Sequence, residues 1–235
     1  MMKSRCFLFF YATVLLAAGS ATAPVLAGAV QVLVQDKAGK PIADAVVIAL
    51  APAGGAGGAV GNAASNAAAT TAATATIIVD QVNKEFVPHV LPIRRGTTVS
   101  FPNKDNIRHH VYSFSPAKVF ELPLYTGIPA SPVLFDKAGA VALGCNIHDW
   151  MVAYVYVADS PYFGKTGADG KVVLNDVPAG KYVIHTWHAR LIGTEAATEQ
   201  QIEVARTGSV ESISVIGLTP EFRVRRAPLP GKSGY

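Results

Sequence analysis

Three side chains with metal-binding donor atoms lie within one short stretch, spaced as C-x2-H-x2-M. They are Cys145, His148 and Met151. A thiolate, an imidazole and a thioether form a soft ligand set, which suits copper in both oxidation states, whereas zinc has little use for a thioether. The stretch contains only one cysteine, which excludes the binuclear copper centre that needs two. The spacing therefore predicts a site for one copper ion.

A second histidine must come from elsewhere in the chain, because a mononuclear copper site of this kind places two imidazoles and a thiolate around the metal, with a long axial thioether. His109 and His110 are both available in the upstream segment NKDNIRHHVYS, residues 103–113. Neighbouring side chains of a strand face opposite ways, so both cannot bind one ion without a bulge. The strand pattern alone does not decide between them.

This two-part ligand pattern resembles that of the cupredoxins over about residues 77–158. Members of that family often carry an N-x-D-x-x-x-H-x-V-x-S stretch before the first histidine ligand. The matching residues here are Asn103, Asp105, His109, Val111 and Ser113. The second loop is most similar to that of the amicyanins, and the whole segment resembles secreted plastocyanin-like proteins of methylamine utilisation. The resemblance implies a Greek-key β-sandwich that binds one type 1 copper through His109 and the C-x2-H-x2-M loop.

The chain departs from the family at His110, where cupredoxins usually have an asparagine that ties the two ligand loops together. Either His110 replaces that tie, or His110 is the ligand and His109 is not. The match of Asn103 favours His109 as the ligand, with Asn103 beside the site. Trp150 follows the proposed ligand His148 in the same loop. Because strand alternation turns Trp150 away from the side of Met151, we expect it to be exposed and to dock a redox partner.

The elements that must hold these residues are β-strands. Glycine and proline, 21 and 15 in number, recur between short runs of valine, isoleucine, threonine and aromatic residues, which predicts an all-β protein. Residues 76–160 contain about seven candidate strands, enough for a compact cupredoxin domain. The expected strands there are 77–82, 90–93, 97–101, 111–114, 133–135, 140–144 and 153–157.

Residues 161–235 resemble the carboxypeptidase-regulatory-like (transthyretin-like) β-sandwich, in the segments TGADGK (166–171) and VPAGKY (177–182). The first two strands of that fold match residues 30–34 and 45–50, far upstream. Two strands cannot bury a face alone. We therefore expect a discontinuous domain, 28–50 plus 161–235, with the cupredoxin domain inserted and the Ala/Gly-rich residues 51–75 as a flexible linker. The alternative is two sandwiches in succession.

Residues 1–27 are expected to be a secretory signal, with Lys3 and Arg5 before an apolar run and small residues up to Ala27. An uncleaved membrane anchor is the alternative. Cleavage would remove Cys6 and leave Cys145 as the only cysteine of a periplasmic or secreted protein without an intramolecular disulfide. The formal net charge of +4 and the short basic C-terminal tail do not indicate nucleic-acid binding.

The expected function is one-electron transfer, because a rigid site with four protein ligands leaves no open position for a substrate. We expect no enzymatic activity. The family resemblance implies a c-type cytochrome or an exported dehydrogenase as the redox partner. Two other functions stay open: copper storage, delivery or sensing, and an extracellular binding module in which copper is structural.

Overall fold

The computed structural model describes residues 27–51, 77–129 and 131–221, and within them the protein is all-β, which confirms the predicted fold class. The only helical element in these ranges is the 3₁₀ turn η1 (Glu195–Thr198), so the described part holds no helix that could cross a membrane. The strands are β1 (Ala27–Gln35), β2 (Val46–Leu50), β3 (Ile77–Ile78), β4 (Asp80–Val82), β5 (Glu85–Val87), β6 (Val90–Arg94), β7 (Thr97–Ser100), β8 (His109–Ser115), β9 (Lys118–Tyr125), β10 (Val133–Phe135), β11 (Gly139–Gly144), β12 (Val152–Ala158), β13 (Tyr162–Lys165), β14 (Lys171–Pro178), β15 (Gly180–Trp187), β16 (Gln200–Val204) and β17 (Ser209–Val215).

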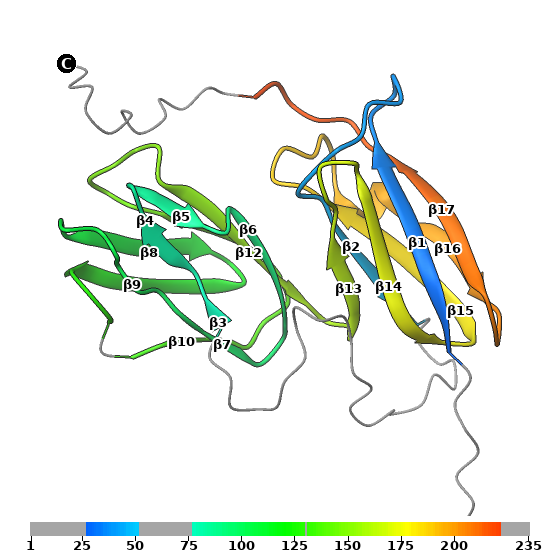
Figure 1. Cartoon of the computed structure of the whole chain (residues 1–235), viewed down its shortest axis with the longest axis horizontal. Coiled ribbons are helices and arrows are strands. Elements are labelled where there is room, and N and C mark those ends of the chain that lie inside the picture. Colours follow the sequence, from blue (N-terminus) through cyan, green and yellow to red (C-terminus); the bar gives the residue numbers. More distant parts are fainter. Residues whose placement is uncertain (1–26, 52–76, 130, 222–235) are drawn as a thin grey trace, which may run out of the picture.

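The first sandwich is formed by strands β3 to β12 (Figure 1). A five-stranded sheet of order β6-β12-β11-β8-β9 faces a three-stranded sheet of order β10-β7-β3. Their inward side chains form one core, in which Phe101 and Phe135 are among the largest fully buried residues. The short hairpin β4–β5 lies beside these sheets and ends in a turn at Asn83 and Lys84.

The second sandwich joins the two ends of the described chain. Strand β1 pairs with both β14 and β17, and β2 pairs with β13 and β15. One sheet has the order β14-β1-β17 and the other β13-β2-β15-β16, and Val32 and Leu174 lie in the core between them. Whether 28–50 plus 161–235 folds as a separate domain stays a prediction. Residues 1–26 and 52–75 of the expected signal and linker lie outside the described residues.

A third apolar cluster lies between the two sandwiches. Val46 and Ile48 of β2, with Trp187 of β15, pack together with Val90 of β6 and Tyr156 of β12. Strand β2 is therefore buried on both faces, one toward its own sandwich core and one toward the neighbouring sandwich. As Figure 1 shows, the two sandwiches lie side by side.

The strand pattern differs from expectation in several places, among them the short strands β5 and β13, which the sequence did not predict. The expected strand 77–82 is split at the buried residue Val79: β3 pairs with β7, and β4 pairs with β5. Strand β9 was not expected at all. It is an edge strand with Pro123 inside it, and proline within an apolar run argues against a strand unless the strand lies at an edge.

Candidate metal centre

Three of the expected ligands converge at one end of the first sandwich. The donor atoms of His109, Cys145 and His148 all lie within 4.8 Å of one another. Cys145 Sγ is 4.0 Å from His148 Nδ1, and the rings of His109 and His148 have centroids 5.0 Å apart. His109 and Cys145 are buried, whereas His148 is partly exposed. No other group of three or more His, Cys, Asp or Glu side chains within the described ranges has this arrangement.

Two structural elements supply these side chains. His109 is the first residue of β8, and the loop from Cys145 to Met151 connects β11 to β12. The loop is tight, because the Met151 amide donates to the His148 carbonyl at 2.9 Å. Strands β8 and β11 pair where Gly144 lies opposite Tyr112. A Cβ atom at Gly144 would lie 2.8 Å from the Tyr112 ring, so glycine permits this close approach directly before Cys145.

The two ring nitrogens of His109 have different surroundings. Nε2 is 2.7 Å from Asp105 Oδ2, while Nδ1 is buried and has no hydrogen-bond partner. A buried polar atom without a partner costs free energy unless something else satisfies it. A metal ion bound by the Cys145 thiolate would do so, and the carboxylate on the far nitrogen is the usual arrangement behind a metal-binding histidine. The residues present therefore fit a copper ion.

His148 is held in the form that binds metals. Burial, followed by the charges of His109 and Lys84, lowers its pKa, and the opposing effect of Asp105 is smaller. The ring is therefore neutral at neutral pH, with a lone pair available on one nitrogen. A cationic His148 would repel a metal ion, so this environment favours ligation.

Met151 is buried in the same core cluster as Cys145, at the start of the chain segment that leads into β12. Only 1% of its surface is exposed, and its thioether is therefore shielded from water. Its part as an axial ligand stays a proposal.

His110 lies outside the cluster of donor atoms, and the pairing of β8 with β9 is irregular between His109 and Val111. Its Nε2 is 2.9 Å from Glu121 Oε1 on the neighbouring strand β9, and its ring lies beside that of Tyr112. Neither Glu121 nor Tyr112 belongs to the loop of Cys145 and His148. The structure thus brings His109, not His110, to the other two donors.

Asn103 organises the loop that precedes His109. Its Nδ2 donates to the carbonyls of Ile107 and Tyr125 at 2.8 Å each, and its Oδ1 accepts from the Asp105 amide at 3.0 Å. Asn103 is 4% exposed. It therefore supports the site by shaping the loop.

Trp150 is half-buried and packs against the core of the first sandwich. Its indole N–H donates to the Lys84 carbonyl at 3.0 Å, and its ring centroid is 5.1 Å from that of His148. The side chain is thus held beside His148 and is less exposed than the strand alternation predicted. A role in docking stays a prediction.

Sequence reasoning missed the residues that hold the ligand loops in place. Asp105 matches the sequence motif, but the motif assigns it no role. The sequence gives no role to Asn83 and Lys84 either, although their backbone amides donate to the Asp105 carboxylate. A backbone group leaves no signature in residue type. The only available signal was the turn-forming Asn83 between two short strands.

A buried polar cluster lies near the site. Tyr125, which pairs with His109 across β8 and β9, accepts a 2.6 Å hydrogen bond from Gln81 and donates to the Phe101 carbonyl. Burial raises the pKa of Tyr125 to about 12, and the Gln81 hydrogen bond opposes this only in part. The phenol is therefore neutral and serves as a hydrogen-bond donor that fixes β9 near His109.

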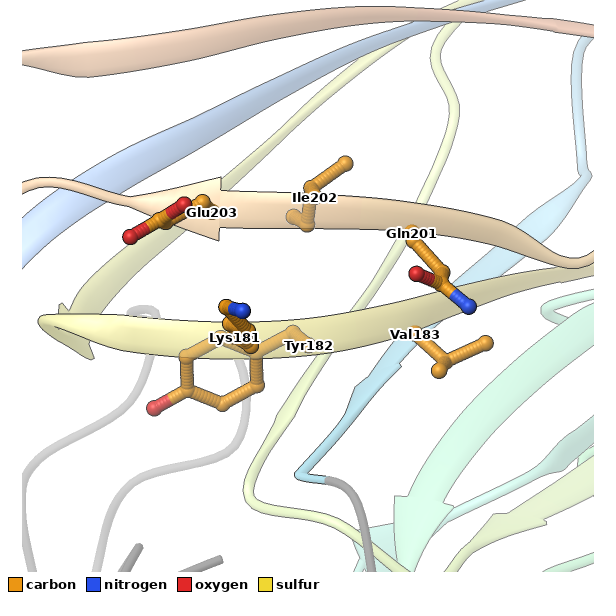
Figure 2. A pocket seen from close by; sticks show the side chains of 6 residues that line it. All are labelled: Lys181, Tyr182, Val183, Gln201, Ile202 and Glu203. Atoms are coloured by element: carbon orange, nitrogen blue, oxygen red, sulfur yellow. The ribbon is translucent and has the colours of Figure 1, made fainter.

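A hollow of about 420 Å³ lies on the second sandwich, on strands β15 and β16. Figure 2 shows the six side chains that line it: Lys181, Tyr182, Val183, Gln201, Ile202 and Glu203. None of them belongs to the cluster of metal-binding donor atoms.

No family model matches the chain, and no curated protein matches it. Among solved structures, the chain is similar to a copper-containing nitrite reductase from Thermus scotoductus SA-01, with 27% identity and a TM-score of 0.34, over 36% of this chain and 23% of that one. It is also similar to a reduced amicyanin variant (23% identity, TM-score 0.34, 37% of this chain and 86% of that one). An oxidised amicyanin variant gives 23% identity and a TM-score of 0.33, over 35% and 82% of the two chains. With TM-scores this low, the similarity does not assign the chain to a family.

Proposed function

We propose that this protein binds one copper ion in a mononuclear type 1 site and carries single electrons between redox partners. The observation that supports this most directly is the convergence of His109, Cys145 and His148, with the buried Nδ1 of His109 lacking any other partner. Two imidazoles and a thiolate are the equatorial ligands of blue-copper sites. Met151, buried nearby in the same core cluster, is the proposed axial ligand.

Copper, when bound, supplies a one-electron couple, and the surrounding chain keeps its geometry constant. The buried residues His109 and Cys145 exclude water from the inner side of the site. The loop of Cys145 is closed by its own backbone hydrogen bond and lies between two paired strands, β11 and β12. His148 is partly exposed, so its ring edge is the proposed route for electrons to a partner. Four protein ligands leave no position for a substrate, and we propose no enzymatic activity.

The family resemblance of the sequence motif supports a c-type cytochrome or an exported dehydrogenase as the partner, with the protein acting in the periplasm or outside the cell. Three methionines in the whole chain are too few for the methionine-rich tracts that would favour copper storage. Electron transfer is therefore the function that the residues of the site support best.

The visible spectrum of the full-length protein loaded with Cu(II) tests this proposal. We expect one copper per chain and an intense blue or green colour from thiolate-to-copper charge transfer. The Cys145→Ser variant should bind without that colour, because a hydroxyl cannot give the transition, and Zn(II)-loaded wild type serves as a colourless control. Colourless wild type after stoichiometric copper binding would reject the type 1 site. Coloured protein that exchanges no electrons with cytochromes or dehydrogenases would favour storage or sensing.

A further inference from the structure

One carboxylate is in direct contact with the proposed copper site. Asp105 lies in the loop before β8, its side chain is 13% exposed, and its Oδ2 is 2.7 Å from His109 Nε2. The other nitrogen of His109, Nδ1, is buried without a hydrogen-bond partner and is therefore the nitrogen left to act as a donor atom with Cys145 and His148. When Nδ1 binds a metal, the ring proton must be on Nε2, so Nε2–H donates to Asp105.

Asp105 is itself fixed by the turn of the β4–β5 hairpin. Its Oδ1 accepts from the Asn83 amide at 2.7 Å, and its Oδ2 accepts from the Lys84 amide at 2.8 Å. Both turn residues have positive φ, 55° and 60°, and this conformation points two successive N–H groups at one anion. Two backbone N–H groups and the His109 ring nitrogen are directed at the two oxygens of Asp105, so the carboxyl group serves as an acceptor at both oxygens, as the ionised form does.

The same turn also holds the second ligand loop. The Lys84 carbonyl accepts the indole N–H of Trp150, whose ring lies beside His148. The Asn83–Lys84 turn thus contacts the segment before His109 through its amides and the Cys145–Met151 loop through its carbonyl. This turn ties the two loops together, the role for which the sequence suggested His110.

We propose that Asp105, held by the Asn83–Lys84 turn, is a positioning residue that fixes the His109 ring and lowers the reduction potential of the copper. This inference rests on the proposed copper function. A carboxylate that accepts the far N–H of a ligand imidazole makes the imidazole a stronger donor. Its negative charge, close to a partly desolvated metal, stabilises Cu(II) more than Cu(I) because the attraction grows with the charge of the ion.

Redox titration of full-length, copper-loaded protein tests the inference, with Asp105→Asn as the variant. Asparagine has nearly the same shape but no charge, so we expect the Cu(II)/Cu(I) equilibrium to shift toward Cu(I) by about tenfold, or about 59 mV for one electron. Asp149→Asn is the matched control, because it removes the same charge from an exposed position in the Cys145–Met151 loop. It should shift the potential less than half as much. An unchanged potential in Asp105→Asn, or equal shifts in both variants, would overturn the inference.

A second measurement separates positioning from folding and does not depend on colour. In wild-type protein loaded with Zn(II), nuclear magnetic resonance should show the His109 ring proton on Nε2, exchanging slowly with water. In Asp105→Asn that exchange should be at least tenfold faster. Rapid exchange in the wild type would overturn the inference even if Asp105→Asn failed to fold. If the Cu(II)-loaded wild type is colourless, the proposed function is rejected. If it is coloured but the Asp105→Asn variant has the same reduction potential, only the positioning role is rejected.

Discussion

The two adjacent histidines of β8 have different partners. His109 lies with Cys145 and His148 in the cluster of donor atoms, and His110 pairs with Glu121 of β9. The pairing of β8 with β9 is irregular between His109 and Val111, and such a bulge changes the direction of the side chains beside it. At the scale of single residues, the position of a side chain on the strand therefore decides its chemistry.

From this difference we expect His109→Ala to change or abolish the copper spectrum, and His110→Ala to leave it nearly intact. Loss of His109 would remove one of the proposed ligands, whereas loss of His110 would remove a hydrogen bond to an exposed carboxylate, a contact that contributes about 1 kcal/mol or less. Visible spectroscopy of the two Cu(II)-loaded variants is the measurement. A greater effect of His110→Ala would mean that the ligand roles are exchanged.

Trp150 is the proposed docking residue for a redox partner, since its ring lies beside that of His148. We expect Trp150→Ala to retain the copper spectrum but to slow electron exchange with a c-type cytochrome, because an aromatic surface near the ligand is lost. Trp150→Phe keeps an aromatic ring without the N–H group and should exchange electrons at close to the wild-type rate. Stopped-flow reduction measures both. Equal rates for Trp150→Ala and wild type would exclude docking, and a lost spectrum would make the role structural.

Among the strands and turns, two glycines with similar backbone angles have contrasting surroundings. Gly170 has φ +72°, and a Cβ atom there would lie 2.5 Å from the Val34 carbonyl oxygen of β1. Gly39 has φ +80°, and a Cβ atom there would meet nothing within 4 Å. The close approach at Gly170 lets the turn before β14 accept a hydrogen bond from the Val34 amide.

We therefore expect Gly39→Ala to destabilise the protein by about 1 kcal/mol, the cost of a left-handed conformation for alanine. Gly170→Ala should cost about 3 kcal/mol, because steric crowding against a fixed backbone is added to the same cost. Denaturant unfolding of both variants measures the difference. Equal losses of stability would show that the β1 backbone can move away from the turn.

The sequence was sufficient to predict much at these two scales, for definite reasons. The cluster of donor atoms was predictable because metal-binding chemistry depends on residue type and spacing, as for Cys145 and His148. The β class followed from the glycine and proline pattern. The Asn83–Lys84 turn was not predictable, because it acts through backbone amides and a carbonyl that any residue type provides. Strand β9 was missed because Pro123 within the run argues against a strand, whereas at the edge of a sheet, beside β8 alone, a proline is tolerated.

At the scale of the whole molecule, the two sandwiches differ in how their strands are distributed along the chain. All strands of the first lie between Ile77 and Ala158, whereas the second needs β1 and β2 from the N-terminal part. Residues 76–160 should therefore fold alone. Residues 161–235 should not, because β13, β14 and β17 would lack their partners.

Circular dichroism and denaturant unfolding of the two fragments test this expectation. A peptide of residues 28–50 added to fragment 161–235 is the control, and it should restore a cooperative transition by supplying β1 and β2. A cooperative transition of fragment 161–235 without the peptide would contradict the discontinuous arrangement. Failure of fragment 76–160 to fold would show that this sandwich depends on the apolar contacts of Tyr156 and Val90 with Trp187.

The parallel pairing of β1 with β17 also sets the order in which the molecule can be completed. Strand β1 begins the described chain, yet Ala29 pairs with Ser209, close to the end of the described chain. The proposed copper ligands and their sandwich lie between these two strands as one continuous segment. On folding, that sandwich can thus close its proposed metal site first, while the first strand, without its neighbour, is vulnerable to misassembly until β17 pairs with it.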